Sequence, residues 1–141
     1  MSSEEDVAGE HVMDALVQAT FQVTGVLSRV GAENDLSLTQ LRVFGILRDR
    51  RPRVTELAAH LGLDKSTISG LIDRAEKRGF LARARSADDR RAVEVFLTPD
   101  GHAVTERLYD KIRRELEPML AGLDAEQRTQ LGGLLRLTLA A

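Results

Sequence analysis

The chain has 141 residues, which suffices for one ordinary domain core, and nothing in the sequence marks a second independent one. It contains no cysteine, which excludes disulfides and thiol-based redox sensing, and its apolar runs are far shorter than the roughly 20 residues of a membrane span. The acidic start, Met1–Asp6, lacks a basic segment followed by an apolar one, so it does not resemble a secretion signal and we expect a cytoplasmic protein.

The net charge of −2 conceals an uneven distribution of charge along the chain. Residues 1–41 carry 1 basic and 7 acidic side chains, residues 42–91 carry 13 basic and 7 acidic ones, and residues 92–141 carry 6 basic and 8 acidic ones. The central segment is therefore positive, as contact with the phosphates of a nucleic acid requires. A basic face that is merely solvated is the alternative that the charge pattern alone leaves open.

The first predicted helix follows a flexible N-terminus, to which we assign residues 1–10. A second helix is predicted from Ser37, whose side chain caps it together with Gln40, to about Arg50. Pro52 then interrupts the helical pattern. The apolar residues of the first helix recur at alternating spacings of four and three, which is typical of a helix that packs lengthwise against others: Val12, Leu16, Ala19, Val23, Val26 and Val30.

Residues 54–79 have the pattern of a helix-turn-helix. Gly62 occupies the turn, where a left-handed backbone costs least for a residue without a Cβ. Asp64 is placed to cap the second helix, which begins at about Lys65 and ends at Gly79. Apolar residues stand where the two short helices would bury them against each other, namely Leu57, Leu61, Ile68, Leu71 and Ile72.

After Phe80 the period of the sequence changes from that of a helix to that of a strand. Residues 81–85 and 93–97 alternate in polarity on either side of a loop that contains Ser86 to Arg91. The alternation predicts a two-stranded hairpin, or wing.

Two further helices are predicted after the wing. Thr98 caps the first of them, and Pro118 indicates a kink or a break near its end. The second begins at Asp124, whose side chain pairs with Gln127. Its apolar residues are Leu131, Leu134, Leu135 and Leu139.

The predicted fold class is mainly α, a winged helix-turn-helix with terminal helices that form a dimerisation region. We assign the DNA-binding lobe to residues 36–97 and the helical dimerisation region to residues 11–35 and 98–141. The terminal helices carry more apolar surface than a single small core would cover, so we expect a homodimer. One monomeric core is the alternative.

These features resemble the multiple-antibiotic-resistance regulator (MarR) family of bacterial winged-helix proteins over roughly residues 10–140. The resemblance rests on Ser37–Gln40, Glu56–Leu63, Ser66–Gly79 and the wing Asp89–Gly101, where Asp-Arg-Arg precedes alternating apolar residues and Leu-Thr-Pro-Asp-Gly. It implies a homodimeric repressor on a palindromic operator in double-stranded DNA. The second helix of the helix-turn-helix would lie in the major groove and the wing over the minor groove. It also implies relief by a small, often aromatic or phenolic effector, for which we assign no residues.

The candidate DNA-binding residues lie on the first turns of the second helix of the motif and on the wing. Short hydroxyls there allow close approach to base edges or phosphates, although simple capping of helix amides is the alternative for Ser66 and Thr67. Arg74 either contacts a phosphate or ties down the wing. The candidates are Lys65, Ser66, Thr67, Ser69, Arg74, Arg85, Arg90 and Arg91.

Arg90 at the wing tip is the strongest single candidate, because a long cation on a narrow hairpin fits the negative potential of a minor groove. We expect Asp88 or Asp89 to hold an arginine by a charge-assisted hydrogen bond. Arg83, like the arginines at positions 85 and 91, is expected to contact a phosphate or nothing. Arg78 is expected only to complement the helix dipole and to aid solubility.

Two positions depart from the family pattern. The wing loop opens with Ser86 and Ala87, where many relatives have Asp-Pro, and Gly70 stands where arginine is frequent. Gly70 removes a base-reading side chain and weakens the helix by about 1 kcal/mol relative to alanine. We therefore expect the operator to be read through fewer direct base contacts.

Other classes of function have less support in the sequence. It has no Ser-His-Asp or Cys-His arrangement, no phosphate-binding glycine loop and no HExxH, so we do not expect an enzyme. His11, His60 and His102 lie far apart without metal-ligand spacing, so we expect neither a metal nor another cofactor. The alternative function is a winged-helix adaptor that binds protein and not DNA, which leaves the basic wing unexplained.

Overall fold

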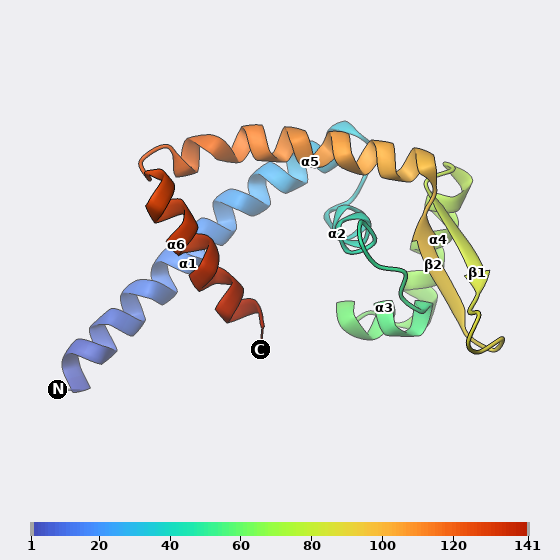
Figure 1. Ribbon diagram of the computed structural model, residues 1–141, viewed down its shortest axis with the longest axis horizontal. Helices are drawn as coiled ribbons and strands as arrows, with labels where there is room; N and C mark the ends of the chain where they lie inside the picture. The colour runs from blue at the N-terminus through green and yellow to red at the C-terminus, as the bar shows by residue number, and fades with distance from the viewer. Residues whose placement is uncertain (1, 141) are drawn as a thin grey trace. The chain divides into compact units, whose positions relative to one another are not determined.

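The computed structural model describes residues 2–140 of the chain (Figure 1). The chain forms two compact units, one of Leu27–Asp110 and one that contains the residues up to Val26 and those from Lys111 onward. The order of elements confirms the predicted mainly α winged helix-turn-helix. It runs α1 (Ser2–Glu33), α2 (Leu38–Ile46), α3 (Val54–Leu61), α4 (Lys65–Lys77), β1 (Leu81–Arg85), β2 (Val93–Leu97), α5 (Pro99–Leu120) and α6 (Ala125–Leu139).

Side-chain caps explain where three of the helices begin. Ser37 Oγ accepts a hydrogen bond from the amide of Gln40 at 3.1 Å, and the Ser37 amide donates to the Gln40 side chain at 2.8 Å. Thr98 Oγ1 accepts from the amide of Gly101 at 3.0 Å, and Asp124 forms a capping box at the start of α6. These caps confirm three helix starts that the sequence predicted, because each cap depends only on residues close together in the chain.

The wing is an antiparallel hairpin with the predicted strands. Its register pairs Leu81 with Leu97 and Arg85 with Val93. An extended segment before α3 adds to its outer edge, because the carbonyl of Pro52 accepts a hydrogen bond from the amide of residue 95 at 3.0 Å. The helix-turn-helix and the wing are thereby joined through backbone as well as side chains.

The core of the Leu27–Asp110 unit lies where α2, α3, α4 and the hairpin converge. Gly62 in the turn between α3 and α4 has the expected left-handed backbone, with a φ of 66°. Phe44 of α2 meets Phe80 edge-on, with the ring centroids 6.1 Å apart. The core contains the fully buried Phe44, Leu47, Leu57, Ile68, Ile72 and Val95.

Three boundaries differ from those expected. Residues 2–10, which the sequence analysis assigned to a flexible end, belong to α1 and have exposed side chains from residue 3 onward. Helix α2 ends at Ile46 and not near Arg50, because its last turn tightens and the amide of Arg48 donates to the carbonyl of Gly45, three residues back. Helix α5 does not break at Pro118 but ends two residues later, and the kink that was the other expectation there stays a prediction.

The unit that contains the two ends of the chain leaves much of its apolar surface open. In α6 none of the described residues is buried, so the predicted apolar face of that helix remains exposed in a single chain. Phe21 in α1 is 73% exposed and Leu139 in α6 is 81% exposed. These side chains are exposed in the single chain, and the homodimer that would cover them stays a prediction. No helix within residues 2–140 is both long and apolar enough to cross a membrane.

Candidate nucleic-acid interface

The N-terminus of α4 is held by its capping residue. Asp64 Oδ1 accepts hydrogen bonds from the amide of Thr67 at 2.7 Å and from the hydroxyl of Ser66 at 2.8 Å. The Thr67 amide, followed by the Ser66 hydroxyl, lowers the pKa of Asp64 below its ordinary value, because both hydrogen bonds favour the carboxylate. The hydroxyl of Ser66 therefore takes part in the cap, and its oxygen keeps its acceptor capacity for a ligand.

The two faces of α4 differ sharply in polarity. Lys65, Ser66, Thr67 and Arg74 are exposed and Ser69 is half-buried. The opposite face is apolar and packs into the core through the buried Ile68, Leu71, Ile72 and Ala75. In helix-turn-helix proteins that bind DNA, the N-terminal residues of the second helix contact base edges in the major groove, and the exposed polar first turn of α4 is compatible with that role.

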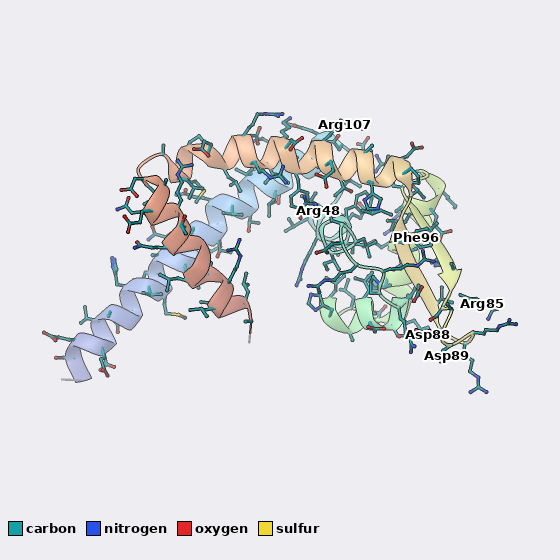
Figure 2. The ribbon with its side chains drawn as sticks, in the orientation of Figure 1. Arg48, Arg85, Asp88, Asp89, Phe96 and Arg107 are labelled. Atoms are coloured by element: carbon teal, nitrogen blue, oxygen red, sulfur yellow. The ribbon has the colours of Figure 1, made fainter. Side chains whose placement is uncertain are left out.

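The wing loop is braced by Arg85, which the sequence placed among the DNA contacts. Its Nη1 donates to the backbone carbonyl of Arg90 at 2.7 Å, across the loop. Figure 2 shows Arg85 near the turn of the hairpin together with Asp88 and Asp89. The guanidinium of Arg85 holds the loop backbone that carries Arg90, and its own predicted contact with DNA stays a prediction.

The two aspartates of the loop act differently from what we expected. Asp89 Oδ1 accepts a hydrogen bond from the backbone amide of Arg91 at 3.0 Å, and the amide of Asp88 donates to the hydroxyl of Ser86 at 3.3 Å. These bonds form local turns of the backbone. The carboxylate of Asp89 therefore caps the backbone of the loop and not the arginine side chain that we expected, whereas Asp88 takes part through its backbone amide.

Arg83 of β1 has a role that the sequence analysis did not predict. Its Nη1 lies 2.7 Å from Asp73 Oδ1 and 2.9 Å from Glu76 Oε1, and its Nη2 donates to the backbone carbonyl of Ser69 at 3.2 Å. We expected a phosphate contact or none, and the structure shows a tie between the wing and the middle of α4. Arg83, and not Arg74, fastens the wing to the helix.

A second arginine fixes the segment before α3 against the other strand of the wing. Arg51 Nε lies 3.0 Å from Glu94 Oε1, and its guanidinium carbon lies 3.9 Å from the centre of the Phe96 ring. Figure 2 labels Phe96 on this strand. No sequence signal pointed to this contact, because the partners are more than 40 residues apart and meet only in the folded lobe.

Three of the predicted site residues meet at one concave surface. A cavity of about 240 Å³ lies between α4 and the wing, and Lys65, Ser69 and Arg91 all line it, together with Arg83. The surface therefore places the hydroxyl of Ser69 near the cations of Lys65 and Arg91, which suits an anionic group such as a phosphate. The charge of Arg83 is already paired with Asp73 and Glu76. Arg90 is exposed on the wing loop, and the predicted contacts of all these residues with DNA remain predictions.

Comparisons with known proteins agree with this geometry. The model of the MarR family matches residues 34–92. The chain is 35% identical over 95 residues to the uncharacterized HTH-type transcriptional regulator YfiV of Bacillus subtilis, and the match covers 67% of this chain and 59% of that relative. It is 28% identical over 128 residues to the HTH-type transcriptional repressor NicR of Pseudomonas putida, covering 90% of this chain and 81% of NicR.

The fold is also similar to that of a solved regulator. The structure of BpsR from Bordetella bronchiseptica, described as showing a mechanism for regulation of DNA binding by 6-hydroxynicotinic acid, superposes with a TM-score of 0.71 at 27% identity. The superposition covers 92% of this chain and 94% of BpsR.

Proposed function

Because this chain belongs to the MarR family, we propose that it is a sequence-specific transcriptional regulator that binds double-stranded DNA as a homodimer. The observation that carries the proposal is the concave surface between α4 and the wing, where Lys65, Ser69 and Arg91 lie together. The relatives named above are regulators and not enzymes, which supports a binding function.

The surface suggests how a duplex is bound. The first turns of α4, with Lys65, Ser66 and Thr67 exposed, enter the major groove. The loop that Arg85 braces then lies over the backbone, with Arg90 directed to the adjacent minor groove, where the negative potential is greatest when the groove is narrow. Short hydroxyls and a glycine at position 70 favour reading of shape over many direct base contacts.

A homodimer accounts for the exposed apolar side chains of the terminal helices. They are Val7, Val12, Met13, Leu16, Val17 and Phe21 of α1 and Leu131, Leu134, Leu135, Leu137 and Leu139 of α6. Many exposed apolar side chains on two helices are costly in water unless another surface covers them. A second copy would present the same helices, and two lobes related by a two-fold axis match a palindromic operator.

We infer the sign of regulation and the response to an effector from the relatives named above. NicR is named a repressor, and the BpsR structure concerns control of DNA binding by 6-hydroxynicotinic acid. We propose that this chain is likewise a repressor, acting in the cytoplasm, whose affinity for its operator falls when a small aromatic acid binds. The effector has no assigned residues in this chain.

The experiment is a gel-shift titration with the DNA upstream of the coding sequence for this chain, at a fixed and stated salt concentration. We expect a shift that resists a large excess of random duplex and weakens steeply with salt, because phosphate contacts release counterions. A shift that random duplex abolishes would contradict a sequence-specific regulator. Failure to bind any duplex would favour the protein-binding adaptor.

A further inference from the structure

A second cavity lies within the Leu27–Asp110 unit. It has a volume of about 480 Å³ and is bordered by the end of α2, the segment that leads to α3, and α3 itself. None of the residues that line it also lines the cavity between α4 and the wing. Its size is that of a site for a small organic molecule.

The cavity combines an apolar wall with two cations. Ile46 and Pro52 are half-buried and Leu57 is buried, and together they form the apolar wall. Arg50 and Arg51 are exposed and supply the cations. A guanidinium presents paired N–H donors that match the two oxygens of a carboxylate. The cavity therefore suits a small organic anion with a compact apolar body and one carboxylate.

The acidic side chains near the cavity leave room for such an anion. Glu56 also lines the cavity, and its Oε1 lies 3.7 Å from Nε of Arg53, so part of its charge is already offset. Asp49 lies 3.9 Å from Arg50, but both side chains are at least 70% exposed, and an exposed pair at this distance is weak in water. His60 adds a ring that can donate to a ligand or accept from it.

Arg51 connects this cavity to the wing. Its Nε lies 3.0 Å from Glu94 Oε1, and its guanidinium carbon lies 3.9 Å from the centre of the Phe96 ring. The side chain of Glu94 is only 23% exposed, so it depends on Arg51 more than a solvated carboxylate would. A ligand carboxylate that binds the guanidinium of Arg51 would compete with Glu94 for it.

Loss of this ion pair would loosen the wing without detaching it. The backbone bond from the amide of Val95 to the carbonyl of Pro52, at 3.0 Å, does not involve the side chain of Arg51. Strand β2 would keep this bond and lose the side-chain attachment beside it. The loop that carries Arg90 would then be held less firmly.

We propose that this cavity binds a small organic anion whose carboxylate draws Arg51 away from Glu94 and thereby weakens the binding of the wing to DNA. The proposal rests on the proposed function and places the response to the anion wholly within the Leu27–Asp110 unit. DNA favours the wing that Arg51 holds, whereas the anion favours a released Arg51. Two ligands that favour different states weaken each other's binding by the same factor.

The first experiment measures binding of 4-fluorobenzoate to the full chain by fluorine NMR. We expect a dissociation constant of about 1 mM or below. Neutral 4-fluorobenzamide and inorganic phosphate are expected to compete only weakly, because the first lacks the charge and the second lacks the apolar body. Equal binding of either compound would overturn the proposed recognition, as would absence of 4-fluorobenzoate binding.

Two substitutions identify the site. Arg51→Gln is expected to weaken binding of 4-fluorobenzoate about fivefold or more, because it removes the paired donors. Glu94→Gln is expected to strengthen it about twofold to threefold, because no carboxylate then competes for Arg51. The control is Arg107→Ala, which removes an exposed arginine that does not line the cavity and is expected to change nothing. Equal binding by all these proteins would show that 4-fluorobenzoate binds elsewhere and would overturn the proposal. If Arg51→Gln folds poorly, Glu94→Gln still decides.

The second experiment measures the affinity for a duplex selected from a random pool, with about 10 mM sodium 4-fluorobenzoate or the same concentration of sodium chloride. The affinity of the unaltered protein is expected to fall about threefold or more, and that of Glu94→Gln less than about twofold, because Glu94→Gln has no ion pair left to break. The ratio within each protein cancels any effect of the substitution on affinity without the ligand.

The outcomes separate this inference from the proposed function. If the unaltered protein prefers a duplex but does not respond to 4-fluorobenzoate, or if Glu94→Gln responds as strongly as the unaltered protein, the coupling is wrong and the regulator stands. If the unaltered protein prefers no duplex, the proposed function fails and the coupling fails with it.

Discussion

Arg90 and Arg85 lie five residues apart on the wing and have different tasks in this account. Arg85 holds the loop by donating to the backbone of residue 90, whereas the side chain of Arg90 is exposed. We predict that Arg90→Ala lowers the slope of log affinity against log salt by about 1 per protomer, because each neutralised phosphate contributes about 0.9. A fluorescence-anisotropy titration between low and moderate salt measures the slope.

The matched control for Arg90 is Arg107→Ala, which removes an exposed arginine on α5, away from the wing (Figure 2). It is expected to leave the slope unchanged. Equal slopes for the Arg90 variant and the unaltered protein would show that Arg90 is an ordinary surface charge.

Arg83 ties the wing to α4 through two carboxylates and one backbone carbonyl, and its side chain is 27% exposed. We predict that Arg83→Ala lowers the free energy of unfolding by about 1–2 kcal/mol, because it removes a charged hydrogen-bond donor and leaves Asp73 and Glu76 without their shared partner. Urea unfolding measures the change. Arg83→Lys is expected to recover only part of it, and an unchanged midpoint for the alanine variant would rule the tie out.

At the scale of the element, the N-cap of α4 leads to a prediction about how the free energy of unfolding depends on pH. The pKa of Asp64 is lower in the folded chain than its ordinary value of 3.8. The stabilisation that the Asp64 cap provides is therefore fully present above the pKa of Asp64 in the unfolded chain. It is lost as the pH falls through the lower pKa that Asp64 has in the folded chain. The free-energy difference between the unaltered protein and Asp64→Asn should be constant above about pH 5 and shrink below about pH 4. A difference that grows on acidification would contradict the cap.

Replacing each of two glycines by alanine should change the free energy of unfolding in opposite directions. A Cβ at Gly70 would meet only the Arg74 guanidinium at 3.5 Å, an ordinary contact, so Gly70→Ala should stabilise α4 by about 0.5–1 kcal/mol. A Cβ at Gly101 would collide with the Phe80 carbonyl, so Gly101→Ala should destabilise by about 2 kcal/mol or more. Urea unfolding of both variants tests the pair, and shifts of the same sign would contradict it.

What the sequence could predict is what lies close together along the chain. The caps at Ser37, Asp64 and Thr98 and the two strands of the hairpin each depend on a few neighbouring residues, and all of them were predicted. The register of the strands was not predicted. The tie made by Arg83 was missed although its partners are near in sequence, because its choice between acids and phosphate depends on how the wing folds against α4.

Contacts between distant segments were not predictable in this way. Arg78 meets carbonyls 43 and 44 residues before it in the chain, and Arg51 meets a carboxylate 43 residues after it. The contacts of Arg48 are of the same kind, because its side chain meets Glu106, 58 residues later in the chain, and the ring of Tyr109. The position of an arginine in the sequence does not indicate which group its side chain will contact in the folded chain.

At the scale of the whole molecule, two surfaces need partners of different chemistry. The unit of Leu27–Asp110 presents the cationic concave surface between α4 and the wing, and the other unit presents exposed apolar helices. Helices α1 and α5 contribute to both units. A DNA duplex would cover the cationic concave surface, and a second copy of the chain would cover the apolar helices. The proposed function therefore requires one assembly in which both surfaces are occupied.

The most direct test of this requirement is the mass of the assembly with DNA, measured by sedimentation on a duplex selected from a random pool. We predict two chains on each duplex, and an assembly that persists in excess random duplex. One chain on each duplex, or equal binding to selected and random duplexes, would contradict a dimer that reads two half-sites.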